Sequence, residues 1–438
     1  MGNIRDYFQG KKSYLFFWSI GLLLELYLVT FGRNKLGIWL GPIGLLLTGL
    51  LIGILPLFFL KERLLEDTIS PKINKKFNWK LALAVGVGCL LVIFILLPNI
   101  LFRFPIDPLQ SDIIPTLLDL YIHRFIQGIP VYTEGLCNGI PCTPNYLPLH
   151  WLPFLISYYL NFDPRILGLI FLTLAISISY GRILINSVPV KFLWLIGLTG
   201  PLWLFLWMKF QSEAFGHTTE SMITAWYIIL GLGIWINTVS SGIIGTLFTL
   251  LSRYSVAFWL PVFGIGKMIS DRKYFYYWIM GVLIGLMGIY VIPFLILEDD
   301  LGAFLRGFSS YPIAAMGEWK GQAWQAAGDP PWQLFRGSGF AAWFYTLVPG
   351  DLVTKFTICR YTHLSISLGG ALLAFGIWYR NRNRIPHGIL WVYSLKVYLT
   401  IFYAFMIVPY EYLWMVPSGF SIIIFLVTIQ AHDFSPTK

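Results

Sequence analysis

Two long uncharged apolar runs set the tightest limit on what this chain can fold into. Residues 81–101 and residues 274–297 contain no Asp, Glu, Lys or Arg. A helix needs about 20 such residues to cross the hydrocarbon core of a bilayer. In that core every backbone polar group must be hydrogen-bonded within the protein, which favours helices. The runs therefore predict a polytopic α-helical membrane protein.

Composition supports the same class. The 438 residues are 57% hydrophobic and 12% charged, whereas a soluble chain carries about 25% charged residues. The formal net charge of +10 includes basic clusters at 61–80 and 380–384, between predicted spans. Such clusters are typical of cytoplasmic loops, so we expect membrane lipids as partners and no nucleic acid.

The hydropathy pattern predicts an all-α polytopic fold of about 12 transmembrane helices with two large outer loops that carry interfacial helices. The first span lacks a small-residue cleavage site and is expected to be a retained anchor. With the N-terminus inside, the basic loops are cytoplasmic, and loops 102–145 and 298–360 lie outside. The expected spans are 14–31, 38–60, 81–101, 146–160, 166–184, 192–208, 219–236, 241–268, 274–297, 361–379, 387–408 and 412–430.

The same order divides the chain into four parts. They are two N-terminal helices with a basic loop (1–80), a catalytic transmembrane module with the first outer loop (81–297), the second outer loop (298–360) and the C-terminal transmembrane helices (361–438). Pro148 and Pro153 interrupt the fourth span, and Gly200-Pro201 the sixth. Broken backbone at membrane depth needs protein or a watery cavity beside it, so we expect a cavity among the middle helices.

The four cysteines predict no zinc site, because none has zinc-ligand spacing with histidine. Cys137 and Cys142 stand in the first outer loop, where a disulfide is compatible with their spacing but not required by it. Cys89 and Cys359 are expected to be embedded in the membrane.

The first outer loop is unusually acidic for a connector. Asp107, Asp112 and Asp119 all lie close to the end of the third span. Ser111 or Asp112 can cap a helix that runs to about Gln127 and stops at Gly128. Asp112, Asp119 and His123 would then share one face. Asp119 and His123 are equally compatible with a solvated face of an interfacial helix.

Several loop residues form a pattern that resembles the GT-C superfamily of membrane glycosyltransferases, especially bacterial mannosyl- and arabinosyltransferase-like branches that use polyprenyl-phosphate sugars. The turn Tyr410-Glu411-Tyr412, with Pro417 after it, resembles the outer turn before the last helix of such enzymes. The inserted Val131 departs from the family's Gly-x-Pro-Tyr-like turn. The remaining residues that carry the resemblance are Ser111-Asp112, Arg124, Gly128, Pro130, Tyr132 and Tyr146-x-Pro148.

The resemblance implies an inverting glycosyltransferase that moves a sugar from a polyprenyl-phosphate carrier to an acceptor hydroxyl. It implies Asp112 as general base and Asp107 as the alternative, with Asp119 a third catalytic candidate. The acceptor would be a glycan, a glycolipid or a protein. The site would face the periplasm from a bacterial inner membrane. No complete metal-ligand set is visible, although a divalent cation (Mg or Mn) is compatible with the chemistry.

Arg253 is the leading candidate for binding the lipid phosphate, because an ionisable residue inside an apolar run indicates a functional site. Lys267 would mark the cytoplasmic end of the same helix, about 21 Å away at roughly 1.5 Å per residue. Snorkelling to the headgroups is the alternative for Arg253. The other substrate-binding candidates are His123, Arg124, Tyr132, Tyr146, Arg306, Lys320, Arg336, Glu411 and Tyr412.

Two rival functions remain open. A transporter or flippase for a lipid-linked glycan would suit the span count, but intramembrane acid is scarce and the two halves show no matching pattern. A GT-C-type glycan ligase or polymerase would keep the lipid-phosphate donor. The segment 211–220 is also open: the topology puts it inside, whereas a half-crossing hairpin would bring it to the cavity.

Overall fold

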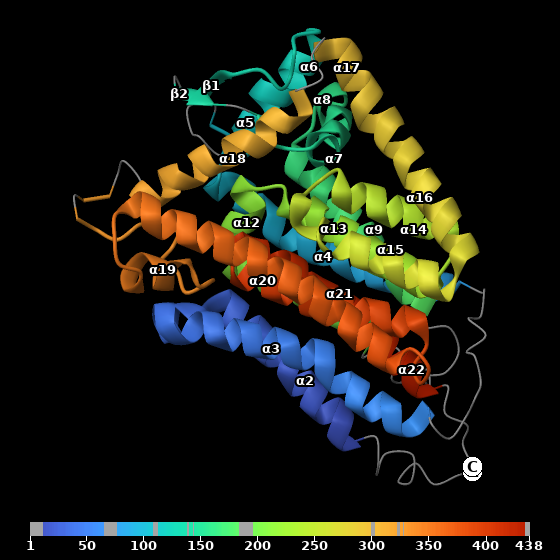
Figure 1. The fold of residues 1–438 in the computed structure, drawn as a ribbon. Coiled ribbons are helices and arrows are strands. Elements are labelled where there is room, and N and C mark those ends of the chain that lie inside the picture. Colours follow the sequence, from blue (N-terminus) through green and yellow to red (C-terminus); the bar gives the residue numbers. More distant parts are fainter. Residues whose placement is uncertain are drawn as a thin grey trace.

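The computed structural model describes residues 12–64, 77–107, 113–137, 140–142, 144–183, 196–298, 303–321, 325–326 and 328–433. This part of the chain is almost wholly helical (Figure 1). Its one sheet is a short antiparallel hairpin of β1 (Gly135–Cys137) and β2 (Ile140–Cys142). Six helices in it are long and apolar enough to cross a membrane: Ile20–Leu57, Trp79–Arg103, Pro164–Ile183, Arg272–Ile296, Leu352–Asn381 and Glu411–Ala431.

The helical elements of the described residues are as follows. The first half of the chain holds α2 (Lys12–Tyr27), η1 (Leu28–Gly32), α3 (Arg33–Leu64), α4 (Trp79–Arg103), α5 (Ile113–Thr116), η2 (Leu117–His123), α6 (Arg124–Ile126), α7 (Pro148–Trp151), η3 (Leu152–Phe154), α8 (Leu155–Tyr159), α9 (Pro164–Ile183), α11 (Thr199–Phe210) and α12 (Ser212–His217). The second half holds α13 (Glu220–Ile236), α14 (Val239–Leu250), η4 (Tyr254–Val256), α15 (Trp259–Ser270), α16 (Arg272–Leu286), η5 (Met287–Val291), α17 (Ile292–Glu298), α18 (Ala303–Lys320), α19 (Ala341–Leu347), α20 (Leu352–Asn381), α21 (His387–Ala404), η6 (Glu411–Trp414) and α22 (Met415–Asp433).

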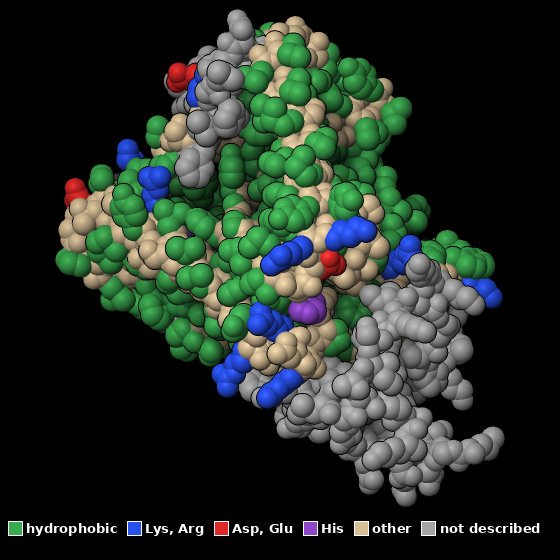
Figure 2. All heavy atoms as spheres, turned by 45° about the vertical axis from the view of Figure 1, so that its right-hand side comes forward, with side chains coloured by type: hydrophobic (Ala, Val, Ile, Leu, Met, Phe, Trp, Pro, Cys, Tyr) green, Lys and Arg blue, Asp and Glu red, His purple; other side chains and the backbone are tan. Residues whose placement is uncertain are grey.

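The surface of the long helices suits a lipid environment. On α4, Phe94 is 79% exposed and Ile95 is 68% exposed. Figure 2 shows that hydrophobic side chains cover most of the visible face, while Lys and Arg gather on its lower part. Contiguous exposed apolar surface of this kind is rare on soluble monomers. The chain therefore has the surface of a membrane protein.

The first two predicted spans form a helical hairpin. Its reversal lies at Gly37, which has φ +66° inside the long element α3. A side chain at Gly21 would meet Ile52, and one at Gly44 would meet Leu28, so the two arms pack against each other. A positive φ is readily adopted by glycine. The reversal therefore agrees with the expected separation of 14–31 from 38–60.

One end of the bundle carries the connecting segments. At this end, Arg165 at the start of α9 donates from Nη1 to the carbonyl of Phe104, just past α4, at 2.5 Å. Gln211 donates from Nε2 to the carbonyl of Thr30 at 2.6 Å. The described residues within 104–163 and 303–351 lie here, and we call it the loop end (Figure 1).

The opposite end carries basic residues. There the Asn78 amide donates to the carbonyl of Gly181 at 2.8 Å, and Arg182 lies over the ring of Phe77. Lys267, at the end of α15, contacts Asn237, at the end of α13. We call this the basic end.

The predicted span 146–160 is wrong. The structure has three short pieces there instead, α7, η3 and α8, none longer than five residues. Pro148 begins the first piece and Pro153 lies in the second, and proline removes a backbone donor that a continuous helix requires. The segment stays at the loop end, so α9 runs from the loop end to the basic end, opposite to the predicted direction.

The predicted span 241–268 is also wrong. The chain forms two 12-residue helices, α14 and α15, separated by a break that contains Arg253. Lys267 returns to Asn237 at the foot of α14, so the two helices form a hairpin. Arg253 lies in its tip instead of inside a continuous helix. Two span errors cancel, and the later helices keep their predicted direction.

Other predictions fare better. The loop helix expected to end near Gln127 is present as α5, η2 and α6, and Gly128 follows with φ +67°. Gly200-Pro201 lies in the first turn of α11, which begins at Thr199, and does not interrupt that helix. The predicted start at 361 is wrong, because α20 begins at Leu352. Cys89 and Cys359 are buried, as expected. Whether Cys137 and Cys142 form a disulfide stays a prediction, because their side chains lie outside the described part.

A charged pair joins the N-terminal hairpin to the last two helices. Lys396 contacts Glu25 Oε1 and donates to the carbonyl of Pro417 at 2.8 Å, and Ser421 Oγ donates to Glu25 Oε2 at 2.7 Å. Glu25 and Lys396 are both 0% exposed. A buried acidic side chain thus lies within the first predicted span, although intramembrane acid was expected to be scarce.

Candidate functional site

A buried ion pair forms the centre of the candidate site. Arg253 donates from Nη1 to Glu220 Oε1 at 2.6 Å and from Nη2 to Oε2 at 2.8 Å. Glu220 is 1% exposed and the Arg253 side chain 18%. Arg253 comes from the tip of the α14–α15 hairpin and Glu220 from the first residue of α13. The two parallel bonds fix the plane of the guanidinium.

His150 of α7 contacts the neighbours of both members of this pair. Its Nδ1 lies 3.2 Å from the carbonyl of Ser252, the neighbour of Arg253, and its Nε2 lies 2.8 Å from Oγ1 of Thr219, the neighbour of Glu220. The Leu149 amide also donates to the carbonyl of Leu251 at 2.9 Å. The short helix α7 is therefore tied directly to the hairpin tip.

Burial keeps His150 neutral. It lowers the pKa of the imidazole to about 3, helped by the positive charge of Arg253 and opposed by the hydrogen bond to Ser252. The ring of Tyr146 stacks on that of His150, with centroids 4.1 Å apart. A neutral imidazole can donate to one partner and accept from the other, which fits the positions of Ser252 and Thr219.

Tyrosines from separate parts of the chain converge on the pair. Burial raises the pKa of Tyr146 to about 12, and its hydroxyl interacts electrostatically with Arg253, Glu220 and Tyr311 of α18. Tyr412 of η6 interacts with Arg253, Glu220 and Tyr146. The segment around α7, the second outer loop and the turn before α22 thus meet at one partly buried polar cluster. We call Tyr146, His150, Glu220, Arg253, Tyr311 and Tyr412 the tyrosine–arginine cluster.

The two loops are also fastened to each other beside the cluster. Tyr121 Oη accepts from the amides of Asn145 and Tyr146 at 2.8 and 2.9 Å. Tyr132 Oη donates to the carbonyl of Tyr146 at 2.9 Å, and Arg306 of α18 donates from Nε to the carbonyl of Tyr132 at 2.9 Å. Tyr132 and Arg306 therefore support the loop that presents Tyr146.

Known proteins do not identify this arrangement. Searches of family models, curated proteins and solved structures found no match. The argument for function therefore rests on the residues of the site.

The catalytic candidates fall in different places. Asp112 lies outside the described residues, and α5 begins at the next residue, Ile113. Asp107 is partly buried just beyond α4. Asp119 and His123 form an ion pair at 3.3 Å, with side chains 59% and 46% exposed, on the open face of η2. The structure does not bring Asp119 or His123 into the tyrosine–arginine cluster.

The remaining binding candidates divide similarly. Arg253, Tyr146 and Tyr412 belong to the cluster, while Lys320 is exposed at the end of α18. Arg124 donates from Nη1 to the carbonyl of Thr133 at 2.9 Å and so shapes the loop. Among the described residues, no group of three or more His, Cys, Asp or Glu could hold a metal ion.

Glu411 joins two arginines beside the cluster. Its Oε2 contacts Arg33, before the Gly37 reversal, and its Oε1 accepts from Nε of Arg336 in the second outer loop. Arg33 is 1% exposed, Glu411 13% and Arg336 22%. Arg336 also lies over the ring of Trp332, 4.4 Å from its centroid.

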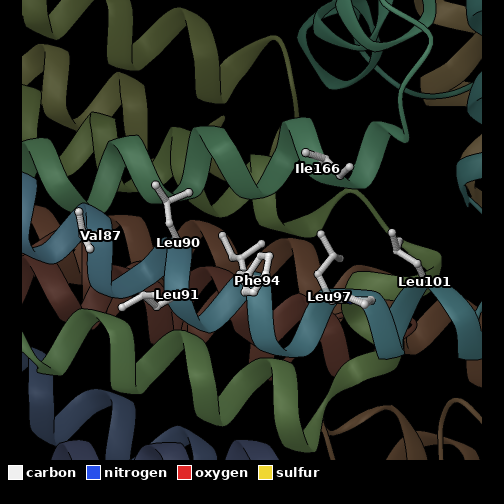
Figure 3. Close-up of a pocket in the computed structure, with 9 residues that line it drawn as sticks. Val87, Leu90, Leu91, Phe94, Leu97, Leu101 and Ile166 are labelled. Atoms are coloured by element: carbon white, nitrogen blue, oxygen red, sulfur yellow. The ribbon is translucent and has the colours of Figure 1, made fainter.

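An apolar groove of about 630 Å³ runs along α4 (Figure 3). The side chains that line it include Leu90, Phe94 and Leu97 of α4 and Ile166 of α9. No member of the tyrosine–arginine cluster lines the groove. It offers surface for acyl chains but no chemistry.

Sequence reasoning missed four residues of the site region, one of which is Tyr311 of α18. Glu220 was left on an uncertain side because the false span at 146–160 reversed the helix that carries it. His150 stood within that false span. Arg33 was taken as part of a connector, although its charge between two apolar runs was a usable signal.

Proposed function

We propose that this protein is an inverting, GT-C-like glycosyltransferase that uses a polyprenyl-phosphate sugar. The observation that carries the proposal is the convergence of the α7 segment, α18 and η6 on Arg253 and Glu220. A lipid carrier cannot leave the bilayer, so its phosphate must be bound near the ends of the helices. A buried guanidinium at the loop end, surrounded by tyrosine hydroxyls, provides hydrogen-bond donors of the required kind.

Arg253 can bind phosphate without leaving Glu220. Guanidinium has five N–H donors; the two bonds to Glu220 occupy two of them, and Tyr403 engages a third. Glu220 therefore orients Arg253 and leaves donors for an anion. Both oxygens of its own carboxylate accept hydrogen bonds from Arg253, which leaves the carboxylate poorly placed to take the acceptor proton.

In the proposed reaction, the acceptor hydroxyl oxygen attacks the anomeric carbon of the sugar. The bond from that carbon to the phosphate oxygen breaks, and polyprenyl phosphate leaves with its negative charge near Arg253. The hydroxyl proton passes to the carboxylate of Asp112, or of Asp107 in the alternative assignment. A single displacement inverts the anomeric configuration.

The finer architecture belongs to the same proposal. The count of about twelve passes is retained when α14 and α15 are counted as two passes and 146–160 is removed. The loop end then faces the periplasm of a bacterial inner membrane, with the basic end in the cytoplasm, because basic residues favour that side. The sugar and the acceptor class, whether glycan, glycolipid or protein, remain for experiment.

The test is sugar transfer by purified protein in nanodiscs, with a short-chain polyprenyl-phosphate sugar and a soluble glycoside acceptor. NMR of the product gives the anomeric configuration. We expect inversion, and we expect Asp112→Asn to lower the rate by about 10²–10⁴. If Asp112→Asn is fully active and Asp107→Asn is not, Asp107 takes the role of base. Wild-type protein that transfers no sugar from a panel of such donors would contradict the proposal.

A transporter for a lipid-linked glycan is the second candidate, and the buried Glu25–Lys396 pair favours it. Intramembrane ionisable residues often mark coupling or transport pathways. In liposomes a transporter would move a fluorescent lipid-linked glycan across the bilayer without altering it. Glu25→Gln would then reduce that flux and leave sugar transfer unaffected.

A further inference from the structure

We propose that Arg33 and Arg336 form a second anion site, which binds the phosphate group of the lipid acceptor. The acceptor assignment rests on the proposed function, whereas the anion site rests on geometry. Two guanidinium groups share the single carboxylate of Glu411, so the triad carries a net positive charge. Glu213 acts on Arg33 electrostatically but forms no ion pair with it in the described part of the chain.

The triad also has unused donors. Arg33 Nε is buried and has no hydrogen-bond partner in the described structure. Arg336 uses Nε on Glu411, and no described residue accepts a hydrogen bond from its terminal nitrogens. Buried polar groups are normally paired, so an unpaired guanidinium nitrogen beside excess positive charge is a donor suited to an anion.

The backbone around Gly337 packs closely against the backbone around Gly37. Gly337 has φ +70°, and a side chain there would lie 2.9 Å from the carbonyls of Arg33 and Gly37. A side chain at Gly41 would lie 2.6 Å from the carbonyl of Gly337. The second outer loop therefore sits directly on the Gly37 reversal, which brings Arg336 to the carboxylate that Arg33 contacts.

The surroundings favour a lipid phosphate over a soluble one. Leu36, Trp39 and Leu40 of the membrane hairpin are 39%, 44% and 57% exposed. These apolar side chains flank the glycine contacts and can cover an acyl or isoprenoid chain. Arg336 supplies the more exposed, polar side of the site. A phosphate with an apolar tail would satisfy both parts.

The site is placed to serve transfer. Glu411 and Tyr412 are adjacent in η6, and Tyr412 interacts with Arg253 and Glu220. The proposed acceptor phosphate and the donor phosphate would therefore bind on either side of η6. The acceptor implied is an anionic, phosphate-bearing lipid with a free hydroxyl.

The test counts molecules of dodecyl phosphate bound to purified protein by native mass spectrometry. Wild type should bind two, and Arg336→Gln and Arg253→Gln one each. Lys35→Gln is the matched control, because it removes an exposed charge two residues from Arg33, and it should still bind two. Affinity at the Arg336 site should fall roughly 10- to 100-fold in Arg336→Gln.

The Glu411→Gln variant distinguishes an anion-binding site from a purely structural salt bridge. Removing the carboxylate should tighten dodecyl phosphate binding by about tenfold, since it leaves both arginines for the anion. A purely structural bridge would give no gain. Binding that is unchanged in both Arg336→Gln and Glu411→Gln would overturn the site.

Two further results assign the ligand and the function separately. Inorganic phosphate in 100-fold excess should not displace the bound probe, and full displacement would overturn the lipid assignment. One wild-type equivalent that is lost in Arg336→Gln but kept in Arg253→Gln would support this site and count against the Arg253 phosphate site. The opposite dependence would overturn the inference.

Discussion

The Arg253–Glu220 pair allows a quantitative prediction. The pair is bidentate and almost wholly buried, with Glu220 1% and Arg253 18% exposed. Removing one partner of such a pair costs about 3–5 kcal/mol, because the other charge stays buried without compensation. The cost of Glu220→Leu should lie at the lower end of this range, since Arg253 keeps some contact with solvent. The cost of Arg253→Met should lie at the upper end, since Glu220 has almost no contact with solvent.

The double variant should be less destabilised than either single variant, because replacing both partners of a buried pair is close to neutral. We expect a coupling energy of at least about 3 kcal/mol. Unfolding in micelles of rising SDS content, followed by near-ultraviolet circular dichroism, measures it. The exposed Asp119–His123 pair is the control, with coupling of about 0.5 kcal/mol or less. Additive single effects of about 1 kcal/mol or less at Arg253 and Glu220 would refute the reasoning.

Three other predictions follow from single sites. The folded-state pKa of His150, about 3, lies below its ordinary 6.5, so the stabilising effect of the neutral ring is complete above pH 6.5 and is lost as pH falls towards 3. The free energy of unfolding, measured across that range, should therefore change less with pH in His150→Asn than in wild type. Gly337→Ala should destabilise by about 1–3 kcal/mol in SDS unfolding, because alanine would have to adopt a positive φ and its methyl group would meet two carbonyls. The control Gly369→Ala lies in open space on α20 and should cost nothing. Equal losses of stability in the two variants would contradict the packing. Asp119→Asn should retain most sugar transfer, since its ion pair is exposed, and a loss of more than about 100-fold would instead make Asp119 catalytic.

The sequence predicted the long helices well because their signal is local. The expected span 81–101 matches α4 to within two residues at each end. The loop helix ending at Gly128 was also predicted, since a cap, a periodic face and a terminal glycine act within a few residues. Helices of this kind depend little on distant contacts.

The site was harder to predict because it depends on long-range contacts. Hydropathy alone does not distinguish a crossing helix from an apolar segment that stays at one end, as at 146–160. The polar run Ser252-Arg253-Tyr254-Ser255 indicated a break in the helix, but the apolar residues on both sides favoured one continuous span. Glu220 can be placed at the site only when the predicted spans 146–160 and 241–268 are replaced by the observed elements. Arg253 was predicted at the end of its helix opposite Lys267, and it does lie at the loop end, although the helix used to infer this is not continuous.

The most direct test of the central claim is a cryo-electron microscopy map of the protein with bound polyprenyl phosphate. The account predicts phosphate density at the loop end, with an oxygen within about 3.2 Å of an Arg253 nitrogen and the isoprenoid chain passing between helices into the lipid. Phosphate density at the basic end, or a continuous channel that joins both ends without contact to Arg253, would contradict it.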